Sequence, residues 1–132
     1  MDITALATKR LAWRNSLSDE DKAKLVAEKQ SWEAEETKAE RMAEFSATFT
    51  TNDTNADGVL DRAEFENFLV ALGQNAANRQ VPHQDNAEYS AEEKDGIYAI
   101  FNAKSEGEGV SQADFFAVML EIGAKVHEIE GQ

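Results

Sequence analysis

Four carboxylates and one carboxamide fall within the twelve residues "DTNADGVLDRAE", which span positions 53–64. Carboxylates this close repel one another unless they face open water or surround a cation. Calcium takes six to eight oxygen ligands, so one loop can supply them only if it winds tightly around the ion. Gly58, in the middle of the stretch, permits such a turn because glycine tolerates backbone angles that other residues resist. The stretch therefore predicts a calcium-binding loop.

Alternate positions of this loop provide the expected ligands. Side chains at positions 1, 3 and 5 point inward, position 7 offers its backbone carbonyl, and position 9 ligates directly or through water. Position 12 reaches back with both of its carboxylate oxygens. In this sequence the six ligand positions hold Asp53, Asn55, Asp57, Val59, Asp61 and Glu64. Their four negative charges favour strong binding of Ca²⁺, and Mg²⁺ is a competitor that demands tighter octahedral geometry.

Helical patterns flank the loop on both sides. Before it, Met42, Phe45 and Phe49 recur at helical spacing. Asp61 is placed to cap the helix that follows, and Gly73 is expected to end that helix. The apolar stripe of this second helix consists of Phe65, Phe68, Leu69 and Leu72. The loop is therefore expected to lie between two amphipathic helices.

Residues 90–124 repeat this arrangement in outline, because "VSQADFFAVM" (110–119) resembles "LDRAEFENFL" (60–69). Ser90 with Glu93 forms a capping-box pattern, and Ser111 with Asp114 is expected to open the last helix. The sequence again predicts a helix, a polar loop and a helix.

The second loop lacks the ligand set in either of two registers. If it starts at Asn102, Lys104 takes a ligand position and Ala113 takes the last one. If it starts at Ala103, the first three ligand positions hold Ala103, Ser105 and Gly107, although Asp114 takes the last one. We therefore expect one Ca²⁺ per chain.

The first loop with its flanks resembles the EF-hand family. It fits the pattern D-x-[DN]-x-[DN]-G-x5-E without a mismatch, and Phe49 and Phe65 match the family's apolar flanks. The resemblance is strong over residues 39–73, weak over 90–124 and absent from 1–33. It implies two hands facing each other, joined by a short two-stranded contact between Leu60 and Val110. The degenerate second hand would then have a structural role.

The expected fold class is all-α, an EF-hand pair preceded by an N-terminal helical extension. The sequence leaves open whether residues 18–52, which Ser18 can cap, form one helix or two helices broken near 34–38. The expected units are the extension 1–33, the first hand 34–73, a linker 74–89, the second hand 90–124 and a C-terminal tail 125–132.

Residues 1–17 form the only basic segment of an acidic chain. Leu6, Trp13 and Leu17 recur at helical spacing beside Lys9, Arg10 and Arg14. An apolar stripe with positive charge suits a helix that docks in a groove of an acidic body. One hypothesis is that residues 1–17 contact the apolar groove of the protein's own hand pair; the alternatives are that the segment extends the core or forms a frayed terminus.

Composition excludes several classes of function. The 132 residues carry a net charge of −13, which repels nucleic acids and anionic lipid surfaces. Absence of cysteine excludes thiolate metal sites and cysteine nucleophiles. No apolar run is long enough for a membrane span, and residues 1–17 lack the core of a secretory signal. No grouping of nucleophile, base and oxyanion donors indicates an enzyme. A cytoplasmic protein without membrane insertion is expected.

Three functions fit these features. In a calcium sensor or regulatory module, the ion opens the hand pair and a protein target binds its apolar groove. In a buffer, calcium binds with little opening. In a structural interaction protein, calcium only rigidifies one loop. The chain has only three Met, which argues against a promiscuous groove. The sensor or regulatory module with a specific target is the favoured hypothesis.

Overall fold

The computed structural model describes residues 2–84 and 89–131, and this part of the chain is mostly helical. Its helices are α1 (Ile3–Asn15), α2 (Asp19–Glu33), α3 (Glu35–Asn52), α4 (Arg62–Asn78), α5 (Ala91–Lys104) and α6 (Gln112–Glu130). Two short strands, β1 (Val59–Leu60) and β2 (Val110–Ser111), interrupt them. The expected all-α fold class is confirmed. In the described ranges no helix combines the length and apolarity needed to cross a bilayer.

Helix starts coincide with the capping residues that the sequence indicated. The side chains of Ser18, Ser90 and Ser111 each accept a hydrogen bond of 3.1 Å from the backbone N–H three residues on. Such a bond satisfies one of the N–H groups that a helix leaves without an internal partner. Ser90 and Glu93 complete a reciprocal capping box at the start of α5. Local side-chain chemistry therefore fixes where these helices begin.

The segment 18–52 forms two helices, α2 and α3, that meet at Ala34. Ala34 has an extended backbone with φ −77° and ψ 130°, which no helical residue adopts. The turn brings the Trp32 ring 6.3 Å from the ring of Phe45, measured between centroids. Arg41 also bonds Glu28 across the turn, with 2.8 Å between Nε and Oε1. The break lies within the range 34–38 that the sequence left open, and these contacts join α2 to α3 across it.

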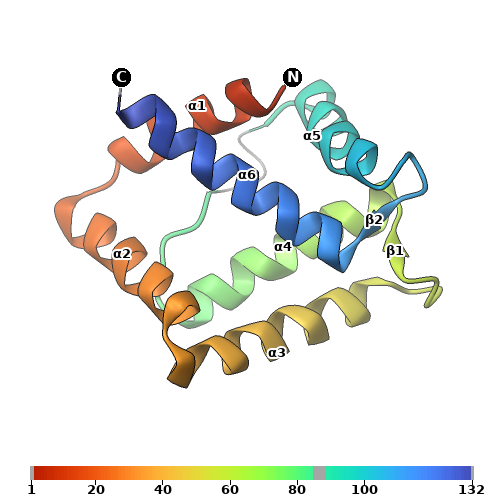
Figure 1. Cartoon of the computed structure of the whole chain (residues 1–132), viewed down its shortest axis with the longest axis horizontal. Helices are drawn as coiled ribbons and strands as arrows, with labels where there is room; N and C mark the ends of the chain where they lie inside the picture. The colour runs from red at the N-terminus through yellow and green to blue at the C-terminus, as the bar shows by residue number, and fades with distance from the viewer. Residues whose placement is uncertain (1, 85–88, 132) are drawn as a thin grey trace.

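The α3–β1–α4 and α5–β2–α6 units face each other, and their loops meet at one end of the molecule (Figure 1). β1 pairs antiparallel with β2, with Leu60 opposite Val110 as expected. The aromatic core lies between the units around Phe115. Its ring centroid is 4.9 Å from that of Phe68 in α4 and 4.9 Å from that of Phe101 in α5. This core holds the two loops side by side.

The N-terminal helix α1 packs along α6 (Figure 1). Its buried residues are Leu6 and Ala7, so the expected stripe of Leu6, Trp13 and Leu17 is only partly correct. Trp13 is half-buried, and the guanidinium carbon of Arg10 lies 4.4 Å from its ring centroid. Trp13 and Leu17 line an open cavity of about 490 Å³ together with residues of α2 and of the segment 80–83.

Two helix ends differ from expectation. α4 passes through Gly73 and ends at Asn78. A Cβ at Gly73 would lie 2.9 Å from His83 Cδ2, so this glycine allows the following chain to cross the helix closely. At the other end of the chain, α6 continues through the residues expected to form a tail and buries Val126. Packing against neighbouring segments therefore extends both helices.

Candidate metal centre

The loop 53–64 leaves α3 at Asp53 and enters α4 at Asp61. Two residues of the loop have positive φ, Ala56 at 55° and Gly58 at 84°. Glycine adopts this backbone region without steric cost, which explains its place at the turn. β1 then fixes the end of the loop against β2. The chain thus winds tightly between two anchored helix ends, as the spacing of its oxygen-bearing residues predicted.

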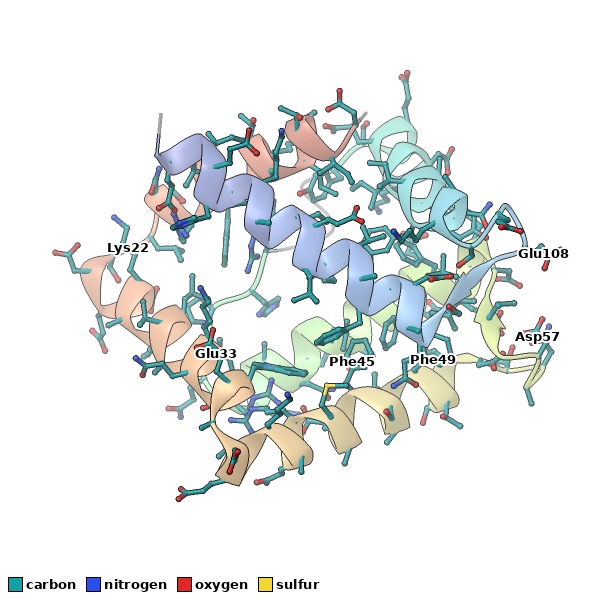
Figure 2. The ribbon with its side chains drawn as sticks, in the orientation of Figure 1. Lys22, Glu33, Phe45, Phe49, Asp57 and Glu108 are labelled. Carbon is teal, nitrogen blue, oxygen red and sulfur yellow. The ribbon has the colours of Figure 1, made fainter. Side chains whose placement is uncertain are left out.

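Three aspartates of the loop are tied to nearby backbone N–H groups. Asp53 Oδ2 accepts from Gly58 at 2.9 Å, and Asp57 Oδ1 accepts from Val59 at 3.1 Å. Asp61 Oδ1 caps α4 by accepting from the N–H of Glu64 at 2.9 Å. These bonds hold the carboxylates within the loop, while Asp57 remains exposed at its tip (Figure 2).

Glu64 lies in the first turn of α4 and is only 6 % exposed. Its Oε1 accepts from the backbone N–H of Asp61 at 3.0 Å, completing a capping box. Its Oε2 accepts from the N–H of Thr54 at 2.7 Å and from the Thr54 hydroxyl at 2.8 Å. The Asp61 N–H, followed by the Thr54 hydroxyl, lowers the pKa of Glu64 despite its burial. Glu64 is therefore held as a carboxylate across the mouth of the loop.

The kinds of ligand in this loop fit a hard cation, because all of them are oxygens. Asp53 Oδ1 is buried and accepts no hydrogen bond. A buried carboxylate oxygen without a partner is unfavourable, and a cation in the loop would satisfy it. Within residues 2–84 and 89–131, however, no three acidic or histidine side chains lie close enough together to hold a metal ion. The carboxylate of Glu64 is bonded to Thr54 and to the backbone N–H of Asp61.

The second loop matches the first at its exit. Val110 lies opposite Leu60, which favours the register that starts at Ala103. Ser111 accepts from the N–H of Asp114 at 3.1 Å, as Asp61 does from Glu64. The hydroxyl of Ser105 donates to Asp114 Oδ2 at 2.6 Å. The exit half of each loop thus combines a strand residue, an N-cap and an acidic side chain in the first turn.

The second loop differs from the first at its entry. α5 continues through Ala103 and Lys104, so the first two positions of the loop are helical. Asn102 Oδ1 accepts from the N–H of Gly109 at 2.8 Å, which closes the turn by a different route. Lys104 bonds Glu121 of α6, with 3.1 Å between Nζ and Oε1. The entry half therefore offers no set of oxygen ligands.

Thr54 is the residue at this site that sequence reasoning missed. It occupies position 2 of the loop, which carries no ligand in the spacing pattern. Its hydroxyl and its backbone N–H both reach Glu64, ten residues later in the chain. A hydroxyl beside the first ligand was the only available signal, and it becomes meaningful only when the fold brings position 12 back to position 2.

Comparison with protein-family models, with curated proteins and with solved structures finds no match to this chain. The functional argument therefore depends on the residues of the loop and on their geometry.

Proposed function

We propose that the chain binds one Ca²⁺ in loop 53–64 and acts as a regulatory module of the EF-hand type. The main support is the complete ligand pattern between two helices, together with the buried, unpaired Oδ1 of Asp53. The ligands would be the side chains of Asp53, Asn55, Asp57, Asp61 and Glu64 with the carbonyl of Val59. The ion would neutralise the crowded carboxylates, and its binding energy would be available to alter the packing of α3 and α4.

A protein target is the proposed partner of this module. Exposed apolar side chains on α6 and α4 support this proposal: Met119 is 46 % exposed, Leu120 is 61 % exposed and Val70 is 49 % exposed. We also propose that α1 occupies the groove of the hand pair as an internal guest. Lys9 in α1 bonds Glu93 in α5, with 2.6 Å between Nζ and Oε2, and Arg14 pairs with Glu130 in α6. Opposite charges therefore support the docking of α1.

A second candidate is a buffer or structural role, in which calcium only rigidifies the loop. The closed aromatic core favours it, because Phe65, Phe68 and Phe115 are each no more than 1 % exposed. Opening the hand pair would have to expose part of this core. The two candidates thus differ in how much apolar surface calcium uncovers.

Calorimetric titration of the chelator-treated full chain with Ca²⁺ tests the proposal. We expect a stoichiometry of one, with binding of an apolar dye increasing as the ion binds. A stoichiometry of two would mean that the second loop also binds calcium. Absence of binding would exclude the proposed function, whereas binding without a change in dye fluorescence would favour the buffer or structural role.

A further inference from the structure

Thr54 supplies two hydrogen bonds to the carboxylate of Glu64, which also interacts with the backbone N–H groups of Asp61 and Asn55. Oε2 accepts both bonds from Thr54, at 2.7 Å from N–H and 2.8 Å from Oγ1, whereas Oε1 accepts one from Asp61 at 3.0 Å. A carboxylate oxygen has about two lone pairs, so the two bonds from Thr54 use both of those on Oε2. A cation can therefore take both oxygens of Glu64 only if at least one bond from Thr54 breaks.

We infer that Thr54 is a positioning residue that holds Glu64 away from the cation and so lowers the calcium affinity of the loop. This inference rests on the proposed function, because it concerns regulation of the same site. Glu64 is buried and needs partners for both oxygens, whether they come from Thr54 or from the ion. Thr54 is exposed, so its hydroxyl can bond water after it releases Glu64. The hydroxyl therefore stabilises the calcium-free state alone.

The second loop shows that this type of closure does not need a set of calcium ligands. There Ser105 Oγ donates to Asp114 Oδ2 at 2.6 Å, although Ala103 and Lys104 occupy the first two positions. In both loops a hydroxyl on the entry side thus bonds the acidic side chain in the first turn of the exit helix. The bond between Thr54 and Glu64 therefore forms without a metal ion. Calcium has to break this bond in order to bind both oxygens of Glu64.

The same geometry bears on the choice between Ca²⁺ and Mg²⁺. With Oε2 bonded to Thr54, Glu64 can offer at most one oxygen, Oε1, to an ion. A single oxygen suits the octahedral shell of Mg²⁺, whereas the larger shell of Ca²⁺ commonly takes a carboxylate through both oxygens. The Thr54 hydroxyl therefore opposes Ca²⁺ more than Mg²⁺.

The test compares the full-length wild type with Thr54→Val, which keeps the shape of the side chain and removes its hydroxyl. We expect the variant to bind Ca²⁺ about tenfold more tightly, because one hydrogen bond to a charged group is lost from the calcium-free state only. Its midpoint of thermal unfolding should fall in chelator, and its Mg²⁺ affinity should rise less than its Ca²⁺ affinity. Thr54→Ser should restore wild-type affinity.

Thr51→Val is the matched control, because the Thr51 hydroxyl donates to the Ala47 carbonyl within α3, at 2.9 Å, and not to a carboxylate. It should leave calcium affinity unchanged. Equal or weaker Ca²⁺ binding by Thr54→Val would overturn the inference and assign Thr54 a purely structural role. An equal rise in Mg²⁺ affinity would overturn the selectivity step. A wild type that binds no Ca²⁺ would instead refute the proposed function, and the inference with it.

Discussion

The two loops of this protein share an exit and differ at their entry. At the exit, Leu60 pairs with Val110, and both loops place an N-cap at the next residue, Asp61 or Ser111. At the entry, α3 ends at Asn52, before the first ligand position, whereas α5 continues to Lys104. The exit half is thus what the fold requires of both loops, and the entry half is where a cation site can be added or lost.

The acidic residue in the first turn of the exit helix contributes both to the fold and to the candidate cation site. Glu64 is long enough to complete a capping box and to reach Thr54 on the far side of the loop. Asp114 is shorter and bonds Ser105 alone across its loop. Hydrogen bonds from Ser105, and then from Ser111, lower the pKa of Asp114. Each acid therefore closes its loop without a cation, but only Glu64 has ligand positions opposite it.

The largest difference between the two loops is expected in calcium affinity when Glu64 or Asp114 is neutralised. Glu64→Gln should weaken Ca²⁺ binding by about 100-fold or more, because it removes a bidentate carboxylate ligand. Asp114→Asn should leave calcium affinity within about twofold, because the second loop lacks the other ligands. Calorimetric titration of both variants measures the difference. If Asp114→Asn were equally damaging, the working site would be elsewhere or shared between the loops.

A second prediction compares the glycines at the turns, Gly58 and Gly109. An alanine Cβ at Gly109 would lie 2.9 Å from Val59 Cγ2 and 3.1 Å from the Leu60 carbonyl oxygen, with φ at 102°. An alanine at Gly58 would meet no atom within 4 Å and would suffer only from its φ of 84°. We expect Gly109→Ala to lower the free energy of unfolding by about 2 kcal/mol more than Gly58→Ala does, because it combines overpacking with backbone strain.

Urea unfolding of the two glycine variants in chelator provides the measurement, since calcium would otherwise stabilise the folded state by mass action. Equal losses would show that the close approach of Gly109 to Val59 and Leu60 adds no penalty beyond backbone strain.

Much of the fold could be predicted from local chemistry. The caps at Ser18, Asp61, Ser90 and Ser111 and the apolar stripes gave the helix starts, because these signals act within one turn. Ends set by distant contacts could not be found in this way. Gly73 resembles a helix stop, yet its missing side chain makes room for His83, ten residues further along the chain. The sequence allowed a break near residues 34–38 without deciding between one helix and two, and in the structure Trp32 contacts Phe45 across the break at Ala34.

In the candidate site, too, some features could be predicted from local spacing and others depend on distant contacts. Its oxygen-bearing residues follow from spacing, because alternate positions of a tight loop point inward. The role of Thr54 does not follow from spacing, because it depends on Glu64 returning across the loop to position 2. Likewise, the sequence offered two registers for the second loop, and only the pairing of Val110 with Leu60 chooses between them.

The smallest expected effect concerns the hydrogen bond that closes the second loop. Ser105→Ala removes the donor 2.6 Å from Asp114 Oδ2 and leaves the carboxylate with fewer partners. Because folding lowers the pKa of Asp114, its contribution to stability is present above the unfolded value of about 3.9 and is lost as pH falls through the folded value. The variant should therefore be less stable than wild type near pH 6.

Its deficit should shrink below about pH 4, as Asp114 becomes protonated in both folded proteins. Urea midpoints in chelator, recorded between about pH 3 and pH 6, measure the effect. Ser46→Ala is a suitable control, because the Ser46 hydroxyl bonds Gln112 rather than a carboxylate. Its effect should not follow the titration of Asp114. A deficit in Ser105→Ala that stayed constant with pH would show that the hydroxyl supports the second loop through its contact with the Ser111 N–H, at 3.4 Å, rather than through Asp114.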